Sequence, residues 1–203
     1  INIEKKEFKF FIPNTVTEWR VDTLLSKEPE TIKWIDEFGG EKKIFWDIGA
    51  NIGIYSIYAV VKHQNIDVVS FEPSFSNLEI LSNNIILNKL NHKIIIAPIA
   101  LNNSTAVNYL NSLNILEGSA HSNFGKKTDQ KGNSFETEIS YKTLGLSLDT
   151  FNKIFRLNEP DYIKIDVDGI EHLILEGGLN LINKKKEILL EVNPDYKEQY
   201  DKI

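Results

Sequence analysis

One segment constrains the fold of this chain more than any other: residues 45–59, with the sequence FWDIGANIGIYSIYA. An apolar run of strand length leads into two glycines and then into an apolar stretch of helical length. This order predicts a strand, a tight turn and a buried helix. In an open α/β sheet such a turn lies at the carboxyl end of a strand, where ligands bind. The segment therefore predicts a parallel sheet and also the place of a ligand site.

The rest of the chain repeats this alternation of strand and helix. Helical patterns over residues 52–62, 73–88 and 170–175 separate the apolar runs, which indicates βαβ units with helices on both faces of a mostly parallel sheet. The expected strands are residues 43–48, 68–71, 93–97, 162–167 and 187–192.

Two regions depart from this rhythm. Residues 1–42 are predicted to form an N-terminal preamble, with a strand near residues 8–12 and a helix over residues 30–38. Residues 103–148 are longer than a plain crossover and rich in Asn, Ser, Gly and Thr, and they end in a stretch of alternating polarity. We therefore expect an inserted β-hairpin beside a loop after the third strand.

Composition narrows the class of protein. The 203 residues, 41% of them hydrophobic, favour one globular domain over residues 1–203, with the α/β core in residues 43–203. The lack of Cys excludes a disulfide framework, a thiolate metal site and a cysteine nucleophile. The net charge of −6 without a basic stripe makes nucleic acid an improbable ligand. No apolar run reaches the roughly 20 residues of a membrane span, so we expect a cytoplasmic protein.

The residue usage also bears on completeness. The chain begins at Ile1 and contains no Met. We therefore expect a fragment or a processed piece of a larger parent chain, unless non-standard residues such as selenomethionine are missing from the sequence. A homo-oligomer is the other assembly that we leave open.

The glycine turn has the form D-x-G-x-N-x-G. It departs from the dinucleotide pattern G-x-G-x-x-G at Asn51 and Ile52, and it lacks the G-K-[ST] of a triphosphate-binding loop. One βαβ unit later, Glu72 ends the second strand, where a carboxylate accepts hydrogen bonds from both ribose hydroxyls. A ribose-binding acid without a basic residue for a pyrophosphate favours S-adenosylmethionine over NAD.

Within the turn, the residue types suggest separate tasks. Gly49 and Gly53 permit close approach and backbone angles that a Cβ forbids. Asp47 is expected to point its carboxylate into the crevice, toward the ammonium of the methionine moiety. The start of the following helix offers N–H groups and a positive dipole end to the methionine carboxylate.

These motifs resemble those of the FkbM-type methyltransferases, a branch of the class I enzymes that use S-adenosylmethionine. The resemblance covers most of the chain and includes EPETIKWIDEF, FWDIGANIGIYS, SFEPSFSNLEILSNNIILN, LSLDTF and YIKIDVDGIEHLILEGG. It implies a Rossmann-like sheet and methyl transfer, usually to a hydroxyl oxygen of a sugar, a glycan or a polyketide-type acceptor. The cofactor-binding positions that it implies are Asp47, Gly49, Ala50, Asn51, Gly53, Glu72, Pro73, Ser74, Asn77 and Ala100.

The chain departs from the class I pattern at its end. Such enzymes normally continue with two more strands, one of them antiparallel, and this chain ends soon after its fifth strand. We therefore expect a truncated edge, or an edge completed by the inserted hairpin or by a partner.

The densest acidic cluster is KIDVDGIEH, residues 164–172. Strand alternation puts Lys164 and Asp166 on one face, so we expect Asp166 to be a catalytic or cofactor-orienting carboxylate that Lys164 holds ionised. Glu171 is either a second acid or a cap of the next helix. His121, in a loop of small residues, is either a general base or a solvated side chain.

Oxygen-bearing side chains at the ends of two strands leave a metal site open. Asp166, Asp168, Glu191 and Asn193 would form an all-oxygen set suited to Mg²⁺, and the alternative for Glu191 is a polar network at the sheet end. The leading functional hypothesis is O-methylation of a glycan, sugar or secondary metabolite. The alternatives are a catalytically silent binding module of a larger protein and a nucleic-acid methyltransferase.

Overall fold

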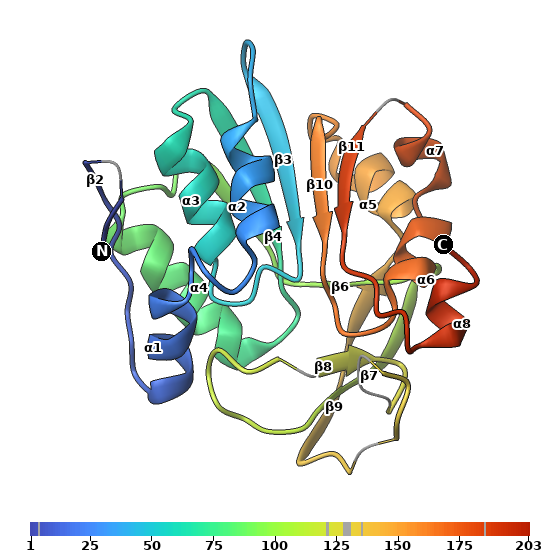
Figure 1. Ribbon diagram of the computed structural model, residues 1–203. Helices are drawn as coiled ribbons and strands as arrows, with labels where there is room; N and C mark the ends of the chain where they lie inside the picture. The colour runs from blue at the N-terminus through green and yellow to red at the C-terminus, as the bar shows by residue number, and fades with distance from the viewer. Residues whose placement is uncertain (4, 121, 128–130, 135, 185) are drawn as a thin grey trace.

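Five parallel strands form the centre of the computed structural model of this chain (Figure 1). The structure describes residues 1–3, 5–120, 122–127, 131–134, 136–184 and 186–203. The strand order is β11-β10-β3-β4-β5, and each of the five matches a strand predicted from the sequence, so the α/β class with a mostly parallel sheet is confirmed. The strands are β3 (Lys43–Ile48), β4 (Ile66–Phe71), β5 (Ile94–Ala97), β10 (Tyr162–Ile165) and β11 (Glu187–Leu190).

Successive residues of β3 point to opposite faces of the sheet, and each face has its own apolar core. Phe45 packs in a cluster with buried residues of four helices, and Trp46 packs in a second cluster with residues of three others. Helices α2 (Pro29–Asp36), α3 (Ile54–Lys62) and α4 (Phe75–Leu87) cover the Phe45 face. Helices α5 (Leu148–Phe155), α6 (Glu171–Glu176) and α7 (Leu179–Ile182) cover the Trp46 face.

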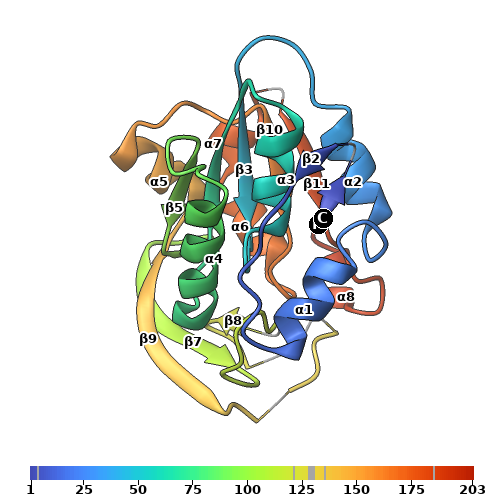
Figure 2. The same cartoon turned by 90° about the vertical axis from the view of Figure 1, so that its left-hand side faces the viewer.

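The insertion after the third predicted strand forms a second sheet. Its strand order is β6-β9-β7-β8, and the long strands β7 and β9 pair antiparallel, as the alternating sequence pattern predicted. Both views place this sheet at the end toward which the parallel strands point, with α1 (Thr15–Asp22) beside it (Figures 1 and 2). The strands are β6 (Ala100–Leu101), β7 (Ala106–Ser112), β8 (Ser122–Phe124) and β9 (Ile139–Leu146).

For the free edge of the central sheet, the sequence left three alternatives: a truncated edge, an edge completed by this hairpin, or an edge completed by a partner. Among the residues that the structure describes, the second sheet pairs with none of the parallel strands, and β11 is the outermost strand. The expectation for the hairpin is therefore wrong. After β11 the chain adds the short helix α8 (Lys197–Tyr200).

The N-terminal preamble contains the helix predicted over residues 30–38, as α2, but differs from the prediction elsewhere. Its regular pairing joins β1 (Asn2–Ile3) to β2 (Lys6–Glu7), and residues 8–12 form no strand. Asn84 of α4 and Asn88, which follows that helix, take the place of a strand partner: the Oδ1 atoms of Asn88 and Asn84 accept from the N–H groups of Lys9 and Phe11 at 3.0 and 2.6 Å. The helix α1 was not predicted, although Asn14 and Thr17 form a capping box at its start.

Among the described residues, no helix is long and apolar enough to cross a bilayer.

Gly53 joins the glycine turn to the core. It has φ +82°, and a Cβ added there would lie 2.4 Å from Cδ1 of Leu81, a buried side chain of α4. An L-residue in this left-handed conformation costs about 1–2 kcal/mol. Displacing a packed leucine typically costs a further 1–3 kcal/mol, so the turn requires glycine here for fold stability.

Gly53→Ala is expected to lower the free energy of unfolding by at least about 2 kcal/mol, from the left-handed backbone and the clash with Leu81 together. Gly39→Ala is the matched control, because that position is open and its φ is not positive. Urea denaturation of both variants measures the difference, and equal stability of the two would contradict the packing argument.

Candidate functional site

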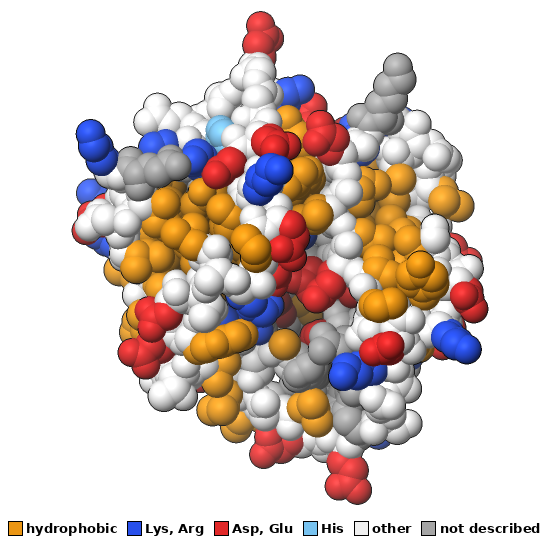
Figure 3. All heavy atoms as spheres, in the orientation of Figure 1, with side chains coloured by type: hydrophobic (Ala, Val, Ile, Leu, Met, Phe, Trp, Pro, Cys, Tyr) orange, Lys and Arg blue, Asp and Glu red, His pale blue; other side chains and the backbone are white. Residues whose placement is uncertain are grey.

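A cavity of about 380 Å³ opens at the carboxyl ends of the parallel strands. Its walls come from the glycine turn after β3, the ends of β4 and β10, the second sheet and α1. Figure 3 shows this region as a hollow with basic side chains on one side and acidic ones on the other. The cavity therefore lies at the edge of the sheet where the sequence placed a ligand site.

Many of the residues predicted for the site line this cavity. From the cofactor set these are Gly49, Asn51, Glu72, Pro73, Asn77 and Ala100, and from the acidic set Asp166, Asp168 and Glu191. Ala50 and Lys164 line a smaller adjoining pocket of about 20 Å³ at the start of α3. Outside both linings lie Asp47, Gly53, Ser74, Glu171 and Asn193.

The glycine turn is held against the sheet by its backbone. The N–H groups of Gly49 and Ala50 both donate to the carbonyl of Phe71 at the end of β4, at 3.0 Å. Gly49 has φ +83°, and a Cβ there would lie 1.8 Å from the carbonyl oxygen of Asp166. Glycine is therefore required at position 49 because the turn packs directly on the backbone at the end of β10, and not because a ligand approaches it.

Glu72 is the buried acid of the cavity, with 5% of its surface exposed. Its Oε2 accepts from the N–H of Asn51 at 2.9 Å, and its Oε1 accepts from the N–H of Ser74 at 2.8 Å. Burial raises the pKa of Glu72 to about 7, although these two N–H donors act in the opposite direction. The carboxyl group therefore joins the turn after β3 to the turn after β4.

The loop 113–120 covers this part of the cavity. The carbonyl of Ser119 accepts from Nδ2 of Asn51 at 2.8 Å and from Nδ2 of Asn77 at 3.3 Å. The N–H of Gly118 donates to Oδ1 of Asn77 at 2.9 Å, and the carbonyl of Gly118 accepts from Nε of Arg20. Side chains of three elements thus fix this loop through its backbone.

Asp47 does not point into the cavity as expected. It is 1% exposed on the α3 side of the sheet, where its Oδ2 accepts from Oγ of Ser56 at 2.5 Å. Burial raises the pKa of Asp47, and the charge of Lys164 acts against that rise. The cause is register, since Asp47 lies beside Lys164 of β10 and Ser70 of β4 on the face that α3 covers. Its predicted contact with the cofactor ammonium is not supported by this placement.

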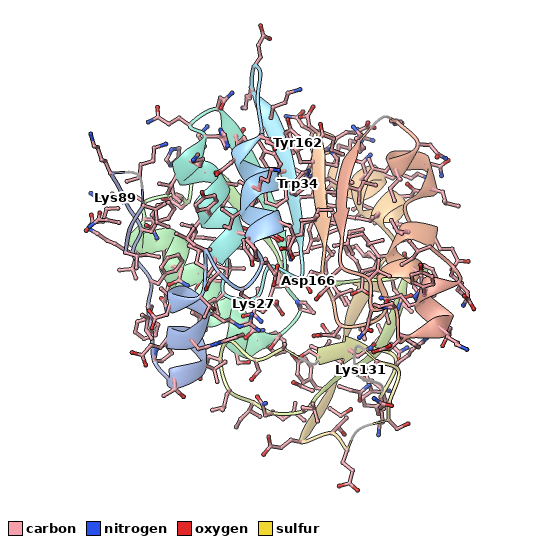
Figure 4. All side chains as sticks on the ribbon, in the orientation of Figure 1. Lys27, Trp34, Lys89, Lys131, Tyr162 and Asp166 are labelled. Atoms are coloured by element: carbon pink, nitrogen blue, oxygen red, sulfur yellow. The ribbon has the colours of Figure 1, made fainter. Side chains whose placement is uncertain are left out.

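Lys164 and Asp166 form the ion pair that strand alternation predicted, with 2.5 Å between Nζ and Oδ2. Lys164 is 3% exposed, whereas Asp166 reaches the cavity (Figure 4). Burial raises the pKa of Asp166, but the charge of Lys164 and the hydrogen bonds with Glu191 and Lys164 together outweigh it and hold that pKa well below its usual range. The carboxyl group of Glu191 is hydrogen-bonded to Asp166, and this bond together with burial raises the pKa of Glu191 to about 9.

Glu171 organises the turn after β10 and has no surface in the cavity. Its Oε1 accepts from the N–H of Val167 at 3.0 Å, and its Oε2 accepts from the N–H of Gly169 at 3.0 Å and from Nε2 of Gln199. Between these donors lies Asp168, which has φ +60° and lines the cavity. Of the two roles predicted for Glu171, this placement favours the structural one.

The metal site is not supported. Among the described residues, no group of three or more His, Asp or Glu side chains is arranged to hold a metal ion. Asn193 uses its Oδ1 to accept from the N–H of Asp195 at 3.0 Å. The candidate base His121 lies outside the described residues.

Sequence reasoning missed the wall that α1 and the segment after it contribute. Trp19, Arg20 and Lys27 all line the cavity, although they lie in the preamble more than 20 residues before the glycine turn. The capping box at Asn14 signals the helix. No local pattern signals its docking, because α1 is placed by long-range bonds such as those from Nδ2 of Asn14 to Glu117.

Solved structures share the fold. Precorrin-6Y C5,15-methyltransferase from Geobacter metallireducens superposes with a TM-score of 0.52 at 15% identity, over 99% of this chain and 77% of that chain. The C-terminal domain of the corresponding enzyme from Rhodobacter capsulatus gives 0.50 at 12% identity, over 85% and 67%. These likenesses confirm the Rossmann-like arrangement of the sheet.

Sequence comparisons bear on the family. Hexuronic acid methyltransferase AglP from Haloferax volcanii is 23% identical over 185 residues, which are 91% of this chain and 70% of that protein. The model of the methyltransferase FkbM domain matches residues 47–202, a span that begins at Asp47 beside the glycine turn and includes every wall of the cavity except the α1 side. The chain belongs to the FkbM methyltransferase family.

Proposed function

We propose that this chain transfers a methyl group from S-adenosylmethionine to an oxygen atom of a glycan sugar. The main support is the position of Glu72, a buried carboxyl group in the cavity at the end of the strand next to the glycine turn. An acid at this position binds ribose hydroxyls in sheets of this type. The match to the FkbM methyltransferase model agrees with that ligand.

The residues present fit the cofactor. Glu72 would accept hydrogen bonds from the ribose hydroxyls, while Pro73, Asn77 and Ala100 would enclose the adenine. The start of α3, beside the smaller pocket, would receive the methionine carboxylate. When bound, the cofactor supplies a sulfonium methyl group, whose transfer to oxygen is an in-line displacement that depends on placement.

Two carboxylates at the end of β10 would then have different roles, one toward the cofactor and one toward the acceptor. Asp166 has a depressed pKa and stays ionised beside Lys164, which suits it to attract a cation and makes it a weak proton acceptor. Asp168 lines the same cavity on the turn that Glu171 holds. We therefore propose that Asp166 attracts the positively charged end of the cofactor, and that Asp168 accepts the proton of the acceptor hydroxyl as the general base.

A sugar acceptor is supported by the relative AglP, whose name gives hexuronic acid as its acceptor. The net charge of −6 argues against a nucleic-acid acceptor. The cavity also combines polar and apolar walls, as an acceptor with hydroxyl groups and a ring requires.

The test of the cofactor is thermal unfolding with S-adenosylhomocysteine, with NAD as the control. A ligand at 100 times its dissociation constant stabilises the folded state by about 2.7 kcal/mol. For a chain of this size the unfolding midpoint is expected to rise by roughly 5–10 °C. An equal shift with NAD, or none with S-adenosylhomocysteine, would overturn the proposal. Binding without methyl transfer to any sugar would indicate a silent module.

The elevated pKa of Glu72 predicts a pH dependence of cofactor binding. Ribose hydroxyls donate to the ionised carboxylate, so binding strengthens as pH rises through about 7. The ionised fraction rises about tenfold between pH 6 and pH 8, and the affinity for S-adenosylhomocysteine should follow it. Calorimetric titration at both pH values should show this rise in the wild type and a flat response in Glu72→Gln. The same slope in the variant would exclude Glu72 as its source.

The two acids are separable by variants. Asp168→Asn is expected to lower kcat by 100-fold or more with little change in S-adenosylhomocysteine affinity, because a general base contributes about 10²–10⁴-fold. Asp166→Asn is expected to weaken cofactor binding about tenfold, because a charged hydrogen bond is lost. Asp201→Asn, at an exposed site outside the cavity, is the control. Transfer of radiolabelled methyl to p-nitrophenyl glycosides measures kcat, and wild-type turnover in Asp168→Asn would refute the assignment.

A further inference from the structure

The wall that α1 contributes has a chemistry that the cofactor does not require. Trp19 and Arg20 are neighbours on α1 and Lys27 follows in the segment before α2, and all three line the large cavity. Trp19 is 48% exposed, so a large aromatic surface is open at the entrance. Val16 lies one helical turn before Trp19 and Arg20 and lines the same cavity. One face of α1 therefore forms the wall.

Both cations of this wall are held in place. Nε of Arg20 donates to the carbonyl of Gly118, and the half-buried guanidinium lines the large cavity and the small one. Nζ of Lys27 lies 2.5 Å from Oε1 of Glu28, a bond that uses one of the three ammonium protons. The fork of an arginine and the remaining protons of a lysine are the donors that bind carboxylates.

Acidic groups occupy the other side of the cavity. Asp166, Asp168 and Glu191 line it from the ends of β10 and β11, and Figure 4 shows Lys27 near Asp166 but on the side of α1 and α2. A ligand between these walls meets cations on one side and carboxyl groups on the other. Electrostatic complementarity then fixes its orientation, with an anionic group toward α1 and hydroxyl groups toward the acids.

We propose that Arg20 and Lys27 bind the carboxylate of an acidic acceptor sugar while Trp19 packs against its ring. This inference rests on the proposed function and adds the determinants of its specificity. The cofactor also has a carboxylate, for which the start of α3 provides N–H groups and a positive dipole end. Arg20 and Lys27 line the smaller pocket at the start of α3 as well as the large cavity. We assign them to the acceptor, because the helix start already supplies donors for the cofactor carboxylate. A neutral sugar would bring no carboxylate to the guanidinium of Arg20 or to the remaining ammonium protons of Lys27, so the cavity favours the acidic sugar.

The test uses a matched pair of probes, p-nitrophenyl β-D-glucuronide and p-nitrophenyl β-D-glucoside, which differ in a carboxylate against a hydroxymethyl group. Calorimetry measures their binding to the protein loaded with S-adenosylhomocysteine. Wild-type protein is expected to bind the glucuronide at least tenfold more tightly. Equal binding, or no binding of either probe, would overturn the inference and leave the S-adenosylhomocysteine result for the proposed function intact.

Variants assign the preference to the wall. Lys27→Gln and Arg20→Gln are each expected to reduce glucuronide affinity about tenfold and to leave glucoside affinity unchanged. Trp19→Leu is expected to lower the affinity for both probes by the same factor. Lys33→Gln removes the same charge from an exposed position on α2, outside the cavity, and should change neither. Because Arg20 also bonds to Gly118, thermal unfolding checks that its variant is folded, and Lys27→Gln gives an independent measurement.

The opposite assignment has its own signature. If Arg20 and Lys27 held the cofactor carboxylate, both variants would lose affinity for S-adenosylhomocysteine itself, and the ratio of glucuronide to glucoside binding would not change. That pattern would contradict the inference. Unchanged S-adenosylhomocysteine affinity together with a lost preference for the acid would establish it.

Discussion

The buried ammonium group of Lys164 determines how β10 pairs with β3 and where Asp166 lies beside the cavity. It is buried between two carboxylates, Asp47 on β3 and Asp166 after β10, and the charges of both raise its pKa against the effect of burial. A buried charge is tolerated only with partners, and removing one partner of such a pair typically costs about 3–5 kcal/mol. The pairing register of β10 with β3 therefore places Lys164 next to Asp47. The same register places Asp166 just after the end of β10, where Gly49 packs against its backbone carbonyl. One buried cation links the sheet register to the position of the acid that faces the ligand.

A second network acts on the cofactor side of the cavity and consists of hydrogen bonds to backbone. Glu72 joins the turn after β3 to the turn after β4, and Asn51 and Asn77 join both to the loop at Ser119. Buried polar groups of this kind specify one arrangement because each unpaired donor or acceptor would cost free energy. Residues expected to contact the cofactor thus also determine the path of the covering loop. A structural role and a binding role do not exclude each other at these positions.

The parts of the fold that the sequence predicted are those set by local pattern. Continuous apolar runs gave the five parallel strands, and β3 has the predicted bounds because both of its faces are buried. Residues 8–12 have a strand pattern and form no strand, because asparagines at the C-terminal end of α4 and just after it accept the hydrogen bonds that a neighbouring strand would have accepted. The direction of Asp47 was wrong for a related reason. Its position at the end of a strand suggested the crevice, whereas pairing with Lys164 and Ser56 decides which way it points.

The same distinction separates the two halves of the candidate site. The cofactor half is built from residues that lie close to one another in the sheet. Short motifs such as D-x-G-x-N-x-G are visible there because close packing requires glycine at fixed positions. The acceptor half brings α1, loop 113–120 and the ends of β10 and β11 together through contacts between segments about 100 residues apart, such as Asn14 with Glu117. Such contacts leave no periodic signal. Residues that make such contacts can also change without disturbing the buried charges around Lys164. A cavity with one rigid wall and one docked wall can therefore keep its methyl donor while the acceptor that it selects changes.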